Sequence, residues 1–220
     1  MVFPVFEDAR IKSAADDTAD QALERRLCEP FCEDFTDPGD LTEYAFGEGL
    51  NRYMDLVFVK GQLHALSVAA LYHLWERTLK AFLILELRAE GLANRKSRTE
   101  NAGFAVLMDD LAALGFNVRK KGYFDSLETV LLVANVCKHG DGDSFVKLQQ
   151  KAPELFSGKN EWRNLFPGKL SEFFKPRAED LWITPIRFEE LGASIEEFWR
   201  SMPERLPVPE SWYRAHDGRG

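Results

Sequence analysis

The sequence predicts an all-α fold, an antiparallel helical bundle with an α-rich C-terminal extension. Apolar residues recur at steps of three and four over residues 54–90, which is the spacing of one helix face. The run Val130–Ala134 is apolar without a break inside a second helical pattern, as in a helix buried in the middle of a bundle. The connections between these stretches are short, which favours antiparallel neighbours.

The N-terminal part predicts two short helices before the long one. The first lies within residues 16–35, with Asp16, Asp17 or Thr18 as its N-cap, and the second lies over 41–47. The long helix over 54–90 ends at Gly91, a residue that commonly stops helices. Its apolar positions include Leu66, Ala70, Leu74, Trp75, Leu79 and Leu85.

Residues 92–100 predict a polar loop, and a third helix follows over 101–114, closed by Gly115. A second basic loop covers 117–122, and the central helix then runs over 123–139. After a turn at 140–143, Asp143 or Ser144 is expected to cap a short helix that ends near Lys151.

The C-terminal part predicts less regular structure. Residues 153–176 are rich in Pro, Gly and Asn but carry aromatic residues, so we expect an ordered loop with short helices. Residues 181–183 predict a brief strand or extended stretch. Thr184 and Pro185 then match the N-cap and first position of a last helix that ends near Met202. The tail from Pro203 is expected to be partly disordered.

Three segments follow from these patterns. Residues 1–50 form an N-terminal helical segment, 51–152 the helical bundle, and 153–220 the extension with its terminal helix and flexible tail. If the three main helices of the bundle run up, down and up, the end of the central helix lies beside the loop 92–100. The basic loop 119–121 then lies at the opposite end.

Composition limits the classes of function. The chain has 36 acidic and 28 basic residues, a net charge of -8, which argues against a general polyanion binder but leaves room for a local basic patch. Three cysteines suit a reducing compartment, and Cys28-x-x-x-Cys32 lacks a second pair that would complete a zinc site. The N-terminus lacks a signal-peptide pattern. Two apolar stretches are not expected to span a membrane, because residues 126–137 are too few and residues 54–87 are interrupted by charged residues. With no phosphate-binding glycine loop either, we expect a cytoplasmic protein with no cofactor, metal or membrane partner.

One polar cluster stands at the end of the central helix. Asn135 and His139 are four residues apart and share a helix face, which Lys138 borders. A histidine there can act as general acid or base on a phosphate, with Lys138 stabilising charge and Asn135 orienting the ring or the ribose. In the structural interpretation, Asn135 satisfies a backbone group and His139 favours the negative end of the helix dipole. Both interpretations stay open.

The pattern A-N-V-C-K-H near a helix end resembles the R-N-x-x-x-H motif of the HEPN superfamily, over about residues 55–150. Members are helical and often dimeric bacterial toxins and anti-phage proteins, many of them metal-independent ribonucleases. Asn135 and His139 match the Asn and His of the motif, whereas Ala134 stands at its Arg position. Lys138 can supply a point charge there but lacks the bidentate fork of arginine.

The resemblance implies an RNA-directed effector of a bacterial defence or toxin–antitoxin system, with ribonuclease activity in a catalytic member. His139, Lys138 and Asn135 are then the catalytic residues, and Arg95, Lys96 and Arg98 are expected to bind RNA. A second copy or a partner protein of the same system is the expected protein partner. Ala134 favours the alternative of a non-catalytic HEPN-like subunit that dimerises or holds a partner.

Overall fold

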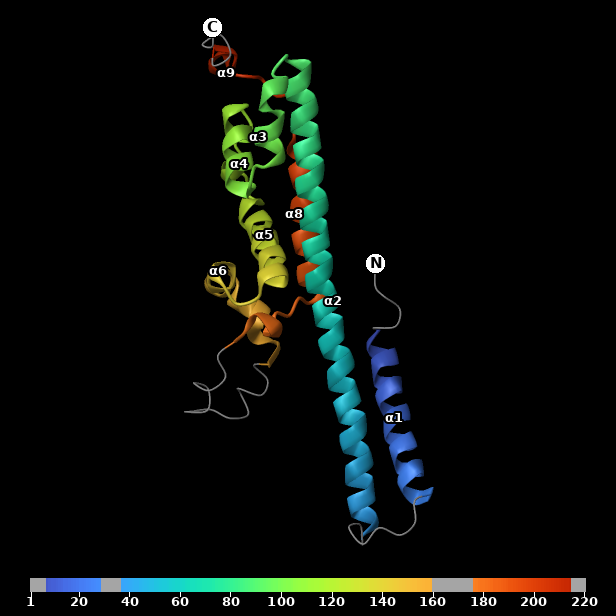
Figure 1. Cartoon of the computed structure of the whole chain (residues 1–220). Coiled ribbons are helices and arrows are strands. Elements are labelled where there is room, and N and C mark those ends of the chain that lie inside the picture. The colour runs from blue at the N-terminus through green and yellow to red at the C-terminus, as the bar shows by residue number, and fades with distance from the viewer. Residues whose placement is uncertain (1–6, 29–36, 160–175, 215–220) are drawn as a thin grey trace. The chain divides into compact units, whose positions relative to one another are not determined.

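The computed structural model describes residues 7–28, 37–159 and 176–214, and every regular element among them is a helix (Figure 1). The predicted all-α class is therefore confirmed. The α-helices are α1 (Asp8–Cys28), α2 (Pro38–Ala89), α3 (Lys96–Glu100), α4 (Phe104–Ala113), α5 (Phe124–His139), α6 (Asp143–Lys151), α8 (Pro185–Ser201) and α9 (Glu210–Arg214). The 3₁₀ helices are η2 (Ala93–Arg95), η3 (Val118–Lys120), η4 (Pro153–Lys159) and η6 (Ala178–Asp180).

The chain divides into two compact units, Met1–Leu63 and His64–Gly220, called unit 1 and unit 2 below. The division falls inside α2, and so does the domain boundary expected after residue 50. The separate helices predicted over 41–47 and 54–90 are parts of this one helix. The stretch between them contains no proline, and a glycine inside a helix costs only about 1 kcal/mol, so nothing in it forces a break.

Unit 1 is a pair of antiparallel helices, α1 and the first part of α2. The Lys60 ammonium contacts the Asp8 carboxylate at 2.8 Å near the start of α1, and Ala15 lies against Gly49 further along. A methyl group at Gly49 would lie 2.9 Å from the Ala15 carbonyl oxygen, so the close approach of the helices depends on glycine there. α1 begins at Asp8, about two turns before the predicted start, because Ile11 and Ala15 are buried in this pair.

In unit 2, α8 runs parallel to α2. The ring of His64 stacks on Phe188 near the start of α8, with centroids 5.6 Å apart. Farther along both helices, Phe82 and Trp199 meet edge to face at 6.4 Å. The two contacts occur in the same order along each helix, which sets the direction of α8.

α5 runs antiparallel to α8. At its start, the hydroxyl groups of Tyr123 and Ser201 share a hydrogen bond of 2.7 Å. Just beyond its end, the Asp141 carboxylate accepts a hydrogen bond of 2.6 Å from the backbone N–H of Ala178, which precedes α8. The C-terminal end of α5 therefore lies at the same end of unit 2 as the start of α8.

The predicted central helix is largely buried, as expected. Leu127, Val130, Val133 and Ala134 are at most 1% exposed, whereas Leu131 is only partly buried. The C-terminal segment expected as an extension contributes to this same core, because side chains before and within α8 pack with those of α2 and α5. These C-terminal core residues are Leu181, Ile183, Leu191 and Phe198.

Local signals placed several helix ends correctly. Gly91 and Gly115 have φ of +76° and +81°, a region that glycine enters without strain. After each glycine, a backbone N–H bonds back five residues, from Leu92 to Leu87 and from Phe116 to Leu111, both at 2.8 Å. All four of these side chains are buried, so each helix ends in a Schellman motif with its apolar contact.

The Thr184–Pro185 start of the last helix is also confirmed, since the Thr184 hydroxyl accepts a hydrogen bond from the Arg187 N–H at 3.2 Å. The predicted cap of α6 is wrong: Gly142 holds the N-cap position, and no side chain caps that helix. Residues 181–183 are extended, and Trp182 donates a backbone hydrogen bond to Leu155 at 2.6 Å.

Two segments are more ordered than expected. Residues 92–100, predicted as a loop, form η2 and α3. The tail from Pro203 contains α9, and the described part buries Leu206 and packs Trp212 against the core. Of the aromatic residues expected to pack in 153–176, Phe156 is buried against Phe145, and residues 160–175 lie outside the described residues.

Candidate functional site

Asn135, Lys138 and His139 occupy the last turns of α5, where Gly140 ends the helix with φ +68°. Asn135 is half-buried, and Lys138 and His139 are exposed. No hydrogen bond or ion pair of these three side chains occurs within the described part of the chain. Among the described residues, therefore, no side-chain or backbone contact orients the His139 imidazole or selects its tautomer, which a general acid or base requires.

Ala134, at the position of the motif's arginine, is 1% exposed. Its methyl group points into the core, together with Val130 and Val133. Lys138, one turn later, is exposed because the helix ends there and its side chain leaves the core. A guanidinium at position 134 would be buried without a partner, so the substitution Ala134→Arg is expected to destabilise the fold and not to complete a site.

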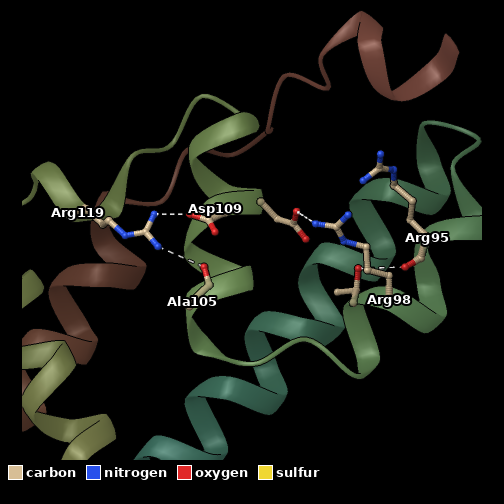
Figure 2. Close-up of polar contacts among 7 residues, drawn as sticks. Arg95, Arg98, Ala105, Asp109 and Arg119 are labelled. Carbon is tan, nitrogen blue, oxygen red and sulfur yellow. Dashed lines mark hydrogen bonds and ion pairs between the residues drawn. The ribbon is translucent and has the colours of Figure 1, made fainter. Parts of the chain in front are cut away.

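Arg95, Lys96 and Arg98 lie on η2 and α3 and form, with Trp212 of α9, a group that we call the cationic end. The Arg95 guanidinium lies 3.8 Å from the centre of the Trp212 ring, a close cation–π contact. The Arg98 guanidinium donates to the Asp110 carboxylate at 2.9 Å (Figure 2). Lys96 and Glu100 form a looser, exposed pair at 3.6 Å.

The electrostatics of the cationic end reflect two neighbouring guanidinium groups that share one carboxylate. Burial raises the pKa of Asp110, and the charges of Arg98 and Arg95 only partly offset this effect. Burial also lowers the pKa of Arg95, and the charge of Arg98 adds to that shift. An anion that binds here would relieve the repulsion between the two arginines.

The second basic loop, residues 117–122, lies beside α4, the helix that also carries Asp110. The Arg119 guanidinium donates to Asp109 at 2.6 Å and to the Ala105 carbonyl oxygen at 3.3 Å. Figure 2 shows Arg119 and Arg98 reaching α4 from two sides. The prediction that the two basic loops lie at opposite ends of the bundle is wrong, since Asp109 and its neighbour Asp110 hold one loop each.

The expected juxtaposition of loop 92–100 and His139 is also wrong. The loop follows the end of α2, whereas the end of α5 lies near the start of α8 and His64 (Figure 1). From His64 to Ala89, α2 rises by about 38 Å at 1.5 Å per residue. The error has a local cause: α3 adds one reversal of the chain, so α5 runs opposite to the predicted direction.

The sequence analysis did not predict Trp212, which belongs to the cationic end, or Asp110, which pairs with Arg98 of that group. Trp212 lies in a stretch that looked like a tail, and the only signal was the apolar-aromatic content of E-S-W-Y. Asp110 lies between Leu107 and Leu111 on the apolar side of α4, a position that places a carboxylate near the core. A charged residue on such a side indicates a buried partner.

Among the described residues, no three His, Cys, Asp or Glu side chains gather closely enough to hold a metal ion. Cys32 lies outside the described residues, so the Cys28–Cys32 pair is not described as a whole.

Of the described helices, only α2 passes as a membrane span by length and composition, with an 18-residue stretch of mean hydropathy 1.3 that is 22% buried. By this criterion the charges of 54–87 do not exclude a span, contrary to the prediction. A single helix of this kind is weak evidence for a membrane span, and α2 also carries the buried Trp75 and Leu79.

In the comparison with known proteins, no protein-family model, curated protein or solved structure matches the chain.

Proposed function

We propose that the chain is a HEPN-like, RNA-directed effector of a bacterial defence or toxin–antitoxin system, and that RNA binds at the cationic end. The observation that supports this proposal is the Arg95–Trp212 contact beside Arg98. The cation–π contact holds the Arg95 guanidinium over the indole, and no ion pair of Arg95 occurs among the described residues. A planar guanidinium with free N–H groups binds phosphate oxygens in pairs.

The proposed nuclease site is separate from this binding site. His139, with Lys138 and Asn135, lies at the other end of unit 2, so the phosphate held by Arg95 is not the one at which His139 would transfer a proton. Cleavage then requires RNA that extends from one end to the other, or a second copy that brings its own cationic end to His139. In this proposal, the residues of the motif are therefore not the residues that bind RNA most strongly.

Binding and cleavage are tested separately. Fluorescence anisotropy with a labelled single-stranded RNA should show affinity that falls steeply with salt, and Arg95→Ala or Arg98→Ala should each reduce the salt slope by about 0.7. Arg200→Ala is the matched control, because Arg200 is an exposed arginine of α8 that pairs with Glu197 at 2.9 Å. Equal losses in all three variants, or no binding by the wild type, would contradict the binding proposal.

A second candidate function is the non-catalytic interaction subunit. Two observations favour it: Ala134 is buried at the arginine position, and no contact orients His139 within the described residues. In this case His139→Ala keeps full biological function and purified protein leaves RNA intact. A His139→Ala variant that folds normally and loses RNA cleavage or host toxicity would exclude this candidate.

A further inference from the structure

The part of α2 in unit 2 has an exposed apolar stripe. Leu66, Leu74 and Leu85 are 54%, 51% and 65% exposed, and the exposed Ala70 and Ala81 lie between them. Steps of four, four, seven and four residues keep these five side chains on one side of the helix. These five residues are called the α2 stripe below.

The opposite side of the same helix is buried in unit 2. Ala65, Tyr72, Trp75, Leu79 and Leu83 are at most 4% exposed and belong to the core. The helix is therefore apolar on both sides, a property of helices that are covered all round. A row of exposed large apolar side chains along one helix side of a folded protein commonly marks an interaction site, and Arg77 interrupts this row between Leu74 and Ala81.

The charges that accompany the α2 stripe are positive. Arg77 and Arg88 are exposed on its side of the helix, and no ion pair of either guanidinium occurs among the described residues. The nearby Glu76 is already paired with Lys80 at 3.2 Å. A partner that covers the α2 stripe must bring carboxylates to Arg77 and Arg88.

A cavity of about 350 Å³ adjoins the C-terminal end of the α2 stripe. Four of its lining residues are apolar and two are cations, an arrangement that accepts an apolar side chain with a carboxylate beside it. Leu87 and Leu92, which form the apolar contact of the α2 end cap, are almost fully buried in its floor. The lining residues are Ile84, Leu87, Arg88, Leu92, Ala93 and Lys96.

We propose that the α2 stripe and the adjoining cavity bind an acidic amphipathic helix of a partner protein. From Leu66 to Arg88, α2 rises by about 33 Å, which corresponds to a partner helix of about six turns. Leucine-type side chains of the partner pack between Leu66, Leu74 and Leu85, where Ala70 and Ala81 allow a close approach. Its carboxylates pair with Arg77 and Arg88.

The charges disfavour a second copy of this chain as the occupant. An antiparallel pair that places Leu66 against Leu85 brings both Arg77 side chains within a turn of the two-fold axis. A parallel pair places Arg77 against Arg77 and Arg88 against Arg88. Either arrangement brings like charges together, whereas an acidic helix neutralises them.

The cavity shares Lys96 with the cationic end, but the α2 stripe contains no residue of that group. The inference therefore does not depend on RNA binding, and the two sites are assayed with different probes. The probe is a fluorescent helical peptide of roughly 24 residues, with leucines at steps of three and four and glutamates on both sides of them. A matched peptide carries lysine in place of every glutamate. Binding is measured by anisotropy on the full chain.

The acidic peptide should bind at least tenfold more tightly than the lysine peptide. Leu74→Lys and Leu85→Lys should each weaken binding at least tenfold, and the double variant Arg77→Glu, Arg88→Glu should reverse the preference. Ile186→Lys is the control, because Ile186 is a 72% exposed residue of α8 and its substitution should change nothing. Circular dichroism melts establish that each variant is folded.

Several outcomes would overturn the proposal. Equal affinity for the two peptides, no binding of the acidic one, or an equal effect of Ile186→Lys would each remove its basis. Sedimentation that shows a dimer of the wild type, dissociated by Leu74→Lys, would assign the α2 stripe to a second copy. Binding to lipid vesicles that Leu74→Lys abolishes would assign it to a membrane surface.

Discussion

Phe198→Ala should be among the most destabilising substitutions in unit 2. The side chain is fully buried, and its ring meets Trp75 at 5.2 Å, Phe116 at 5.9 Å and Tyr123 at 6.5 Å, residues from three other segments of the chain. Truncation of a buried phenylalanine costs about 3–5 kcal/mol of unfolding free energy. Since domains are stable by only about 5–15 kcal/mol, the variant should be near the limit of folding.

Phe198→Leu separates the two contributions to this loss. It keeps most of the buried apolar surface but removes the edge-to-face contacts, so we expect a loss of about 1–2 kcal/mol. The measurement is urea unfolding of the full chain, followed by tryptophan fluorescence and by circular dichroism. Ile186→Ala, on the same helix but exposed, is the control and should stay within about 0.5 kcal/mol of the wild type.

The result also decides whether α8 is part of the bundle. If α8 were an appendage, Phe198→Ala would produce a separate early transition and leave the main transition of the remaining helices unchanged. A loss below about 1 kcal/mol in a single transition would equally refute the reasoning, because the mutational scale for buried aromatic residues would not apply.

Three further predictions follow from burial. Asp110→Asn removes a carboxyl whose pKa is raised by burial. Because the folded wild type takes up this proton more readily than the unfolded chain, its unfolding free energy should rise relative to that of the variant as pH falls through that pKa. Melts of both proteins between neutral and acid pH measure the difference. Burial raises the pKa of the Cys137 thiol, so at mildly alkaline pH iodoacetamide should label the exposed Cys28 well before Cys137, as peptide mass spectrometry would show; equal rates would contradict it. In denaturant melts, Leu127→Ala should cost about 2–5 kcal/mol and the partly exposed Leu131→Ala clearly less, and equal losses would mean that Leu131 is as buried as Leu127.

Features that depend on a few neighbouring residues could be predicted from the sequence. Gly91, Gly115 and the pair Thr184–Pro185 mark helix ends because backbone conformation and capping are local properties. The burial of α5 could be predicted because Val130–Ala134 leaves no polar side to face water.

Features that depend on distant partners could not be predicted in the same way. Apolar periodicity along α2 indicates a helix but does not say which side is covered, and Leu66 and Leu74 proved to be exposed while Trp75 is buried. The direction of α5 depends on how many times the chain reverses before it. The reversal at α3 could not be predicted, because a helix of five residues is too short to show apolar periodicity. The Arg95–Trp212 contact joins residues far apart in the sequence, which only the fold reveals.

The contacts of unit 2 imply an order of events during folding. Arg98–Asp110 and Arg119–Asp109 join residues 12 and 10 positions apart, so the loops that they close are small and form at low entropic cost. The hydrogen bond from the His64 ring to the Ile183 carbonyl oxygen, by contrast, spans 119 positions. Contacts of short range form first, and α8 docks only after the chain up to Ser201 has left the ribosome. Until then the aromatic partners of Phe198 stay uncovered, which makes the interval before α8 docks the one most exposed to aggregation.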